Sequence, residues 1–149
     1  MSSNSKREKI ILAVKAEIEE ITTVKTVLRT IPTIQDLQNF AITQLPVVAM
    51  VAGLPVPSQH KTSRSLNKDV FLSDLTIELF TYFQDNQNTD TALSSLLDDL
   101  WVKLYQDQTK GGLTIYTTLK PIPVRGYWKP FYAFKLDLVL TYYHDTGGI

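Results

Sequence analysis

The chain has 149 residues, of which 44% are hydrophobic and 20% charged, a composition that suits one folded domain with its own core. Fifteen basic and fifteen acidic residues give a formal net charge of zero, which argues against a protein that binds nucleic acid alone through its phosphates and is weakly compatible with self-assembly. The absence of cysteine excludes disulfides, thiol nucleophiles and cysteine metal sites, and no apolar run approaches the roughly 18 residues of a transmembrane helix.

The N-terminal segment predicts a helix over residues 5 to 20. Before it, the polar start MSSNSKREK lacks the apolar core of a signal peptide, so we expect a protein made in the cytoplasm that stays there until it joins something. Ser5 can cap the helix, with Glu8 three residues on, as in a capping box. Its apolar stripe recurs at three- and four-residue steps: Ile10, Ile11, Val14, Ile18 and Ile21.

A strand is predicted over residues 22 to 30, which are rich in β-branched side chains. Period-two alternation would place Val24, Thr26 and Leu28 on one face of it.

Three segments follow before the middle of the chain. Residues 33 to 40 predict a short helix, and residues 45 to 52 predict an apolar strand. Pro46, near the start of that strand, indicates either an edge strand or a first strand position. Residues 53 to 69 form a long polar connection, which in a small domain is usually functional or disordered.

Two long strands carry the clearest period-two pattern. Residues 131 to 143 alternate so that one face is apolar, and residues 70 to 83 could run beside them. The apolar face of the final strand consists of Tyr132, Phe134, Leu136, Leu138, Leu140 and Tyr142.

A second helix is predicted over residues 90 to 106. Its broad apolar stripe consists of Leu93, Leu96, Leu97, Leu100, Trp101 and Leu104. Gly111 and Gly112 are expected to stop it. A further strand at residues 113 to 119 should then be broken by Pro121 and Pro123.

These elements together predict an α+β fold. The order of strands and helices is neither strictly alternating nor separated, which favours a mixed, mainly antiparallel sheet of four to five strands with two main helices packed on one face. No linker or repeat divides the chain, so we expect a single domain over residues 1 to 149.

No pattern predicts catalysis, a metal site or a cofactor site. His60 and His144 are far apart in sequence, and we interpret them as surface histidines. Asp98 and Asp99 are adjacent on a helix and point in different directions, which is typical of a solvated face. We therefore do not expect an enzyme.

Two basic segments could bind a partner. Lys61, Arg64 and Lys68, with His60, form a loop that could contact an acidic partner or passing nucleic acid, or could simply be solvated. The segment from Arg125 to Lys129, RGYWK, is predicted as an aromatic and basic loop between prolines. Arg and Trp are enriched at interface hot spots, so Arg125 and Trp128 are candidate contacts. Alternatively, Trp128 folds back over the sheet.

The second face of the final strand is unusually apolar for a wet surface. Phe131, Val139 and Tyr143 lie on it. Either another layer of this chain or a neighbouring copy is expected to cover them.

The order of elements resembles the tail terminator (tail completion) proteins of tailed bacteriophages. The resemblance runs over nearly the whole chain as a pattern of elements and not as a signature motif. It consists of the helix REKIILAVKAEIEEI, the strand QLPVVAMV at residues 44 to 51, a long polar loop, the strand DLTIELF at residues 74 to 80, a helix, and the ending AFKLDLVLTYYHD at residues 133 to 145.

This resemblance implies a structural virion protein without catalytic residues. Such a protein would form a homo-oligomeric ring, commonly of six, on the head-proximal end of the tail tube, and would assemble in the host bacterial cytoplasm. Its partners would be the tail tube protein, the sheath in contractile tails and a head-completion protein. Genomic DNA would pass its lumen without sequence recognition. The loops around Lys61, Arg64 and Lys68, and around Arg125 and Trp128, would then make ring or tube contacts.

Three other interpretations stay open at this point. The chain could be another phage neck protein, such as a head-closure or tail-tube-associated protein. It could also be a small-ligand or nucleic-acid-binding α+β module. An enzyme is the least favoured, because it would need clustered titratable groups in a pocket.

Overall fold

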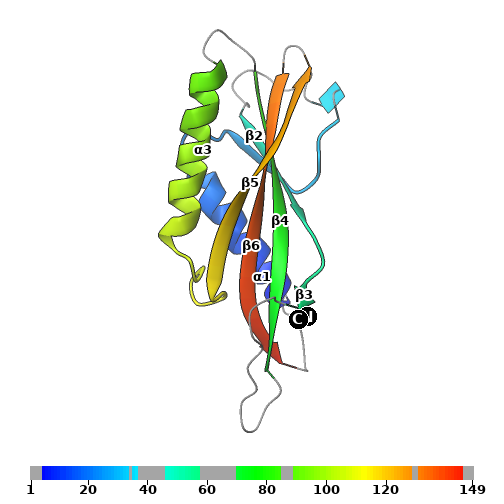
Figure 1. Ribbon diagram of the computed structural model, residues 1–149, viewed down its shortest axis with the longest axis vertical. Helices are drawn as coiled ribbons and strands as arrows, with labels where there is room; N and C mark the ends of the chain where they lie inside the picture. Colours follow the sequence, from blue (N-terminus) through cyan, green and yellow to red (C-terminus); the bar gives the residue numbers. More distant parts are fainter. Residues whose placement is uncertain are drawn as a thin grey trace.

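The computed structural model describes residues 5–33, 35–36, 46–57, 70–84, 89–128 and 131–145. The strands β4, β5 and β6 run along the long axis of the molecule (Figure 1). In chain order the elements are α1 (Lys6–Glu19), β1 (Thr26–Leu28), β2 (Val47–Ala52), β3 (Val56–Pro57), β4 (Val70–Gln84), α3 (Thr89–Gln106), β5 (Tyr116–Trp128) and β6 (Phe131–Asp145).

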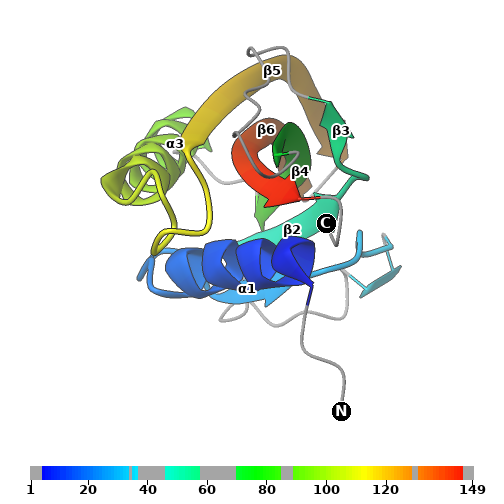
Figure 2. The ribbon, with the colours of Figure 1, turned by 90° about the horizontal axis from the view of Figure 1, so that it is seen from below.

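One sheet contains all of these strands, in the order β1-β2-β4-β6-β5, with the short β3 also paired to β4. β1 and β2 are parallel, and every other pairing is antiparallel. Strands β4 and β6 form the centre of this sheet. They pair along their whole length, from Val70 opposite Asp145 to Gln84 opposite Phe131. Seen from below, the sheet curves from β2 through β4 and β6 to β5 (Figure 2). The predicted mixed, mainly antiparallel sheet is confirmed.

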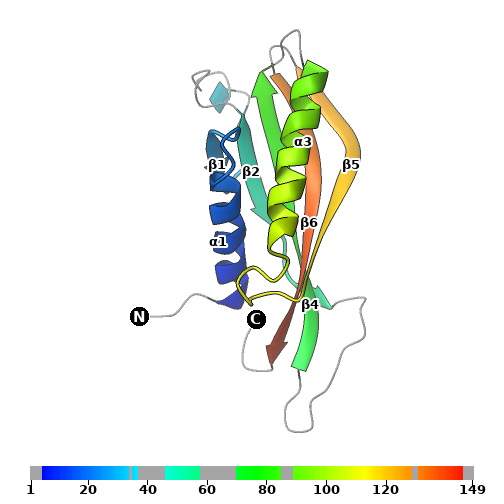
Figure 3. The same cartoon turned by 90° about the vertical axis from the view of Figure 1, so that its left-hand side faces the viewer.

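Both helices pack on one face of this sheet, as predicted, and lie side by side (Figure 3). We call this the inner face and the opposite one the outer face. The inner face of β6 carries the predicted alternate residues, all buried in the main core or packed against it. From the helices, the core takes Ile10, Ile11, Val14, Ile18, Leu93, Leu96, Leu100 and Leu104. The apolar stripe predicted for each helix therefore packs on the inner face and covers the core.

The start of α1 is as predicted. Ser5 is the N-cap in an extended conformation, and its hydroxyl accepts a hydrogen bond from the backbone N–H of Glu8 at 3.1 Å. This bond satisfies one of the N–H groups that the first helical turn leaves without a partner.

The strand predicted at residues 22 to 30 is shorter in the structure. Only Thr26–Leu28 is extended as β1, and Thr22 and Thr23 form a turn. The predicted common face is therefore wrong, because Val24 precedes the strand and packs into the main core, whereas Leu28 packs against a cluster on the outer face. β1 covers one side of β2, so β2 is not an edge strand. Pro46 immediately precedes β2, and its carbonyl accepts hydrogen bonds from the N–H groups of Lys25 and Thr26.

The two prolines predicted to end a strand do not end β5. The strand continues through Pro121 and Pro123 to Trp128, with a bulge between Ile122 and Arg125. β5 is the edge of the sheet, where a missing N–H costs no ladder bond, and bulges accommodate proline. The segment predicted as a loop is therefore edge strand.

α3 differs from its prediction at two points. It ends at Gln106, several residues before the glycines, which adopt positive φ angles of 71° at Gly111 and 90° at Gly112 in the following turn. Trp101 was predicted in the buried stripe but is 38% exposed. Four leucines one or two turns apart already fill the inner side of the helix, so the next position projects outward.

Two predicted segments fall largely outside the described residues. Of the short helix predicted at 33 to 40, only Gln35 and Asp36 are described as helical, and Thr33 and Asp36 exchange backbone-to-side-chain hydrogen bonds of 3.0 Å. Within the long polar connection, Val56 and Pro57 form β3, opposite Asp74 and Ser73 of β4.

Candidate assembly surfaces

The outer face has an exposed apolar patch near the end of the sheet where β3 pairs with β4. The register aligns Val56, Asp74, Thr141 and Tyr116 in one row across β3, β4, β6 and β5. Val56 is 52% exposed and Tyr116 49% exposed. Tyr143, two residues beyond Thr141 on the same face, is 42% exposed. We call Val56, Tyr116 and Tyr143 the outer-face patch.

A satisfied hydrogen bond lies at the centre of this patch. The hydroxyl of Thr141 donates to Oδ1 of Asp74 at 2.6 Å, and Thr141 is buried. A partner that covered the patch would therefore meet a carboxylate that already has a hydrogen-bond donor, which lowers the cost of removing water from it.

The first turn of α1 holds both sides of the patch. Lys6 donates from Nζ to the carbonyl of Tyr143, and its ammonium lies 5.9 Å from the centre of the Tyr142 ring. Arg7 donates to the carbonyl of Gly53 from both Nε (3.2 Å) and Nη2 (3.1 Å), and from Nη2 to that of Ala52 (3.3 Å). These bonds fix the end of β6 and the β2–β3 corner to one helix, so the patch is carried on ordered backbone.

Further along the outer face lies a charged band. Nζ of Lys135 is 3.6 Å from Glu78 and 3.5 Å from Asp137, and it lies 5.6 Å from the centre of the Phe80 ring. Glu78 and Asp137 are directly opposite one another across β4 and β6, so the lysine offsets the repulsion between two like charges. Lys120, exposed on β5, lies opposite Asp137 on its other side.

A second exposed apolar group lies on α3. Val102 is 58% exposed. The ring of Trp101 packs against the ring of Tyr105, with 46° between the ring planes and 5.3 Å between the ring centres. We call Trp101 and Val102 the helix patch. α3 covers the inner face of the sheet, so the helix patch and the outer-face patch lie on opposite sides of the sheet.

The free edge of β5 is partly blocked against pairing with another strand. The N–H of Leu119 donates to the hydroxyl of Tyr105 at 2.8 Å instead of to β6. The N–H groups of residues two positions apart point to the same side of a strand. Pro121, which has no N–H, therefore offers no hydrogen-bond donor at the same free edge. A covered N–H, a proline and a bulge are three ways to prevent edge-to-edge pairing. We therefore do not assign this edge as an assembly surface.

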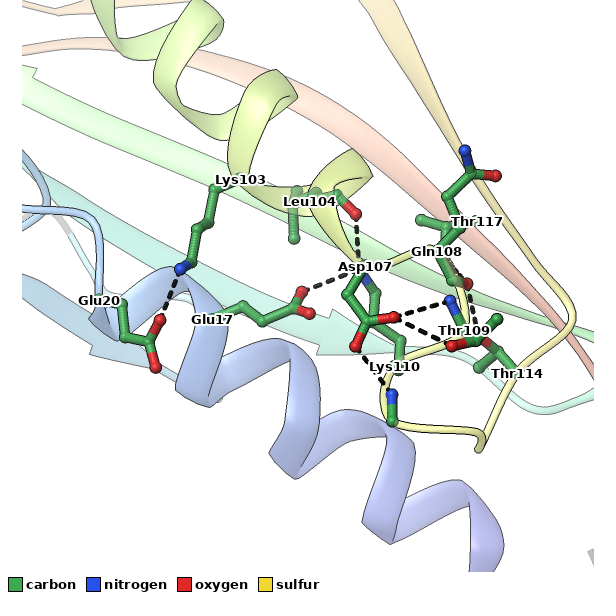
Figure 4. Close-up of polar contacts among 11 residues, drawn as sticks. Glu17, Glu20, Lys103, Leu104, Asp107, Gln108, Thr109, Lys110, Thr114 and Thr117 are labelled. Atoms are coloured by element: carbon green, nitrogen blue, oxygen red, sulfur yellow. Dashed lines mark hydrogen bonds and ion pairs between the residues drawn. The ribbon is translucent and has the colours of Figure 1, made fainter.

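A polar cluster behind the C-terminal end of α3 joins the two helices (Figure 4). The side chain of Lys110 is fully buried; its Nζ donates to the carbonyl of Leu104 at 2.6 Å and forms an ion pair with Oε2 of Glu17 at 2.8 Å. Burial raises the pKa of the Glu17 carboxyl above its usual value, although Lys110 opposes this effect. Lys110 thus caps α3 and fixes it to α1, which is a structural role.

The turn that contains Lys110 is shaped by hydrogen bonds to one carboxylate. Asp107 accepts from the N–H and hydroxyl of Thr109 and from the N–H of Gly111. These hydrogen bonds lower the pKa of Asp107. On the other side of the turn, Thr114 and Thr117 donate from their hydroxyls to the carbonyl of Gln108 (Figure 4).

A pocket of about 540 Å³ opens between the turn after α1 and the first half of α3. Its size falls in the range of small-ligand sites. The floor includes Phe83 and Leu96, which are buried, and the rim includes Thr23, whose hydroxyl donates to Asp99 at 2.9 Å. The remaining lining residues are Thr22, Lys25, Pro46, Ala92 and Ser95. The described lining has one amine and no carboxylate or imidazole.

The candidate contacts predicted from sequence are only partly placed. Lys61, Arg64 and Lys68 lie outside the described residues, so their role stays a prediction, as does that of His60. Arg125 and Trp128 lie in β5 opposite Phe134 and Phe131, not in a loop. On the second face of β6, Val139 is half-buried and Tyr143 is exposed.

Sequence reasoning missed most of the two patches. Tyr116 could have been found, because it alternates with the inward Thr117 and Leu119 and so had to face outward. Trp101 was predicted in the core because its spacing along the helix places it in the broad apolar stripe. No signal in the sequence identified Val56, since its pairing with β4 depends on a two-residue strand inside a polar segment.

Comparison with protein-family models gives no match, and comparison with curated protein sequences gives none either. In the described part of the chain, no three His, Asp or Glu side chains come together as metal ligands. None of the helices in that part is both long and apolar enough to cross a bilayer.

Proposed function

We propose that this protein is a structural subunit of a phage tail terminator. In this role it forms a homo-oligomeric ring at the head-proximal end of the tail tube, ends tail polymerisation and offers a surface for head joining. Its partners are the tail tube protein, the sheath where there is one, and a head-completion protein. Its location is the virion tail.

One observation supports assembly most directly. Among the residues that the structure describes, the outer-face patch and the helix patch are both exposed and apolar, and they lie on opposite sides of the sheet. A closed ring requires contacts in which two different surfaces of one subunit meet. A dimer built on a two-fold axis would need only one self-complementary patch. The phage assignment itself depends on the order of elements, with the helix at the start and the long LDLVLTYY strand at the end.

The ring is tested by the mass of the purified protein, measured by light scattering after size exclusion. We expect a mass near six times 16.9 kDa, and electron microscopy should show rings. Incubation with isolated tail tubes from a siphophage or myophage lysate in which this gene is disrupted should place one ring at one end of each tube. Tubes that stay uncapped, and that continue to vary in length when the protein is supplied during assembly, would contradict the terminator function.

The pocket supports a second candidate, a small-ligand-binding module. Its volume and its largely apolar lining fit a compact apolar molecule with one polar group near Lys25 or the threonines. Native mass spectrometry of the protein purified from cells would show retained mass above 16.9 kDa for this module. The ligand-binding module would be favoured over the terminator if the protein is monomeric, retains such a ligand and does not bind tail tubes.

A further inference from the structure

We infer that the pocket between the turn after α1 and the first half of α3 binds a small anionic amphiphile, an aromatic ring system that carries a carboxylate or a sulfonate. The inference rests on the second candidate function, because it names the ligand class of the same pocket. It does not require the ring, which concerns other surfaces of the protein.

Small side chains of α3 leave room for the pocket. Ala92, Ser95 and Leu96 are three and four residues apart, so they share one face of the helix. The pocket beside them measures about 540 Å³, a volume in the range of small-molecule sites. Because protein interiors are otherwise closely packed, a hollow of this size over an apolar floor favours a ligand with an apolar body.

The aromatic ring in the floor of the pocket is ordered by its neighbours. The centre of the Phe83 ring lies 5.4 Å from that of Tyr132 and 6.3 Å from that of Phe134, two residues of β6. Phe83 is therefore in place before a ligand arrives, which lowers the entropic cost of binding. A flat ring placed against Phe83 would extend this aromatic cluster and loses less freedom than an alkyl chain. The floor thus favours an aromatic body.

The described lining of the pocket carries a positive charge. Lys25 is the one ionisable side chain in it, and its Nζ donates to the carbonyl of Thr22 at 2.8 Å, so the ammonium is held at the rim. Lys103 and Lys110 each form an ion pair with a glutamate. Lys25, in contrast, forms no ion pair with any residue that the structure describes. Its charge is available to an anionic group of the ligand.

A carboxylate just outside the described lining opposes this charge. Asp99 accepts a hydrogen bond of 2.9 Å from the hydroxyl of Thr23, which is a lining residue. Lys25 lines the pocket and Asp99 does not, so the ammonium should dominate the affinity for an anion. The two residues should nevertheless act on an anionic ligand with opposite signs, which allows the preference to be tested from both sides.

Two fluorescent probes that differ by one charge test the ligand class. Anilinonaphthalenesulfonate carries the sulfonate, and phenylnaphthylamine is the same ring system without it. In fluorescence titrations of the whole protein, Lys25→Met should weaken binding of the sulfonate by about two- to fivefold, the range for an exposed ion pair, and should leave the neutral probe unchanged. Asp99→Asn should strengthen binding of the sulfonate alone. The matched control is Lys9→Met, which removes an exposed lysine from the first half of α1 and should change neither probe.

Two neighbouring serines test the location of the site. Ser95 and Ser94 are both exposed on α3, but only Ser95 is in the lining. Ser95→Phe should fill the mouth of the pocket and abolish saturable binding of both probes, whereas Ser94→Phe should not. Far-ultraviolet circular dichroism and a thermal melt confirm that each variant is folded, and Ser95→Leu replaces Ser95→Phe if the larger side chain destabilises the protein.

The outcomes separate this ligand class from the proposed functions. Loss of both probes in Ser95→Phe, with a charge effect confined to the sulfonate, supports the inference. If the wild-type protein binds neither probe, or if Ser94→Phe and Ser95→Phe act alike, the inference is wrong. It is also wrong if Lys25→Met changes both probes equally, and a neutral ligand retained on purification would then keep the ligand-binding module without the anionic class. Rings formed by a protein that binds neither probe would overturn the ligand class and leave the terminator proposal intact.

Discussion

The two faces of the sheet differ in the kinds of side chain that they carry and in how deeply those side chains are buried. The inner face places mainly aliphatic and aromatic side chains under two helices, with Ser73, Thr81 and Thr117 buried among them. The outer face alternates small apolar clusters, a charged band and an exposed patch along the same strands. Neighbouring residues of β6 therefore belong to different environments, and the difference shows which face supplies stability and which face is available for contacts.

The largest expected effect comes from comparing adjacent positions on β6. Leu138 faces inward and is fully buried, whereas Val139 faces outward and is half-buried. Leu138→Ala should lower the free energy of unfolding by about 2–5 kcal/mol, because it removes buried carbons and leaves a cavity. Val139→Ala should cost less than about 1.5 kcal/mol, since the site is partly wet. Urea denaturation of both variants measures the difference, and equal losses would show that the outer face is also covered core.

The alternation that separates these two faces is also what the sequence predicted best. Period two in β4 and β6 and the three- and four-residue steps in α1 and α3 are local patterns, and burial of one side is enough to explain them. The positions of Leu136, Leu138 and Leu140 could therefore be assigned without knowing the fold.

Features that depend on pairing between distant segments could not be predicted in this way. Proline normally ends a strand, and only the edge position of β5 explains why Pro121 and Pro123 do not. The exposure of Trp101 follows from how completely four leucines fill the space beneath α3. The outer-face patch exists because β3, β4, β6 and β5 align in one register, and register is a property of the assembled sheet.

A smaller effect is expected from two lysines that each hold acidic side chains. Lys110, on the helix side, is fully buried beside Glu17, whereas Lys135, on the outer face, is half-buried between Glu78 and Asp137. Lys110→Met should cost about 2–4 kcal/mol, because the Glu17 carboxylate loses its ion-pair partner in a partly buried site and α3 loses a cap. Lys135→Met should cost about 1 kcal/mol or less, because water screens the remaining charges.

The double variant Lys110→Met/Glu17→Gln is the control for this comparison. It removes the uncompensated charge together with the lysine, so it should be more stable than Lys110→Met alone. If the double variant is no better, the cost of Lys110→Met comes from the lost cap at Leu104 and not from the stranded carboxylate.

The smallest effect is a pH dependence that differs in sign between two carboxyls of the same cluster. Burial raises the pKa of Glu17, so the native state holds this proton more tightly than the unfolded chain does. The stability that Glu17 contributes is therefore fully present below pH 4.5, the ordinary pKa of a glutamate. It declines as the pH rises through the raised pKa of Glu17. Hydrogen bonds from Thr109 and Gly111 lower the pKa of Asp107, so its contribution is present above its ordinary value of 3.8 and is lost as the pH falls.

Urea denaturation between pH 3 and pH 7 resolves the two contributions. Relative to wild type, Glu17→Gln should gain stability as the pH rises across the acidic range, because the variant no longer loses a proton from a buried site. Asp107→Asn should show the reverse trend, with its deficit largest at neutral pH and shrinking as the solution becomes acidic. If the profile of Glu17→Gln ran parallel to that of wild type, the pKa of Glu17 would not be raised in the native state, and the attraction of Lys110 would then offset the effect of burial completely.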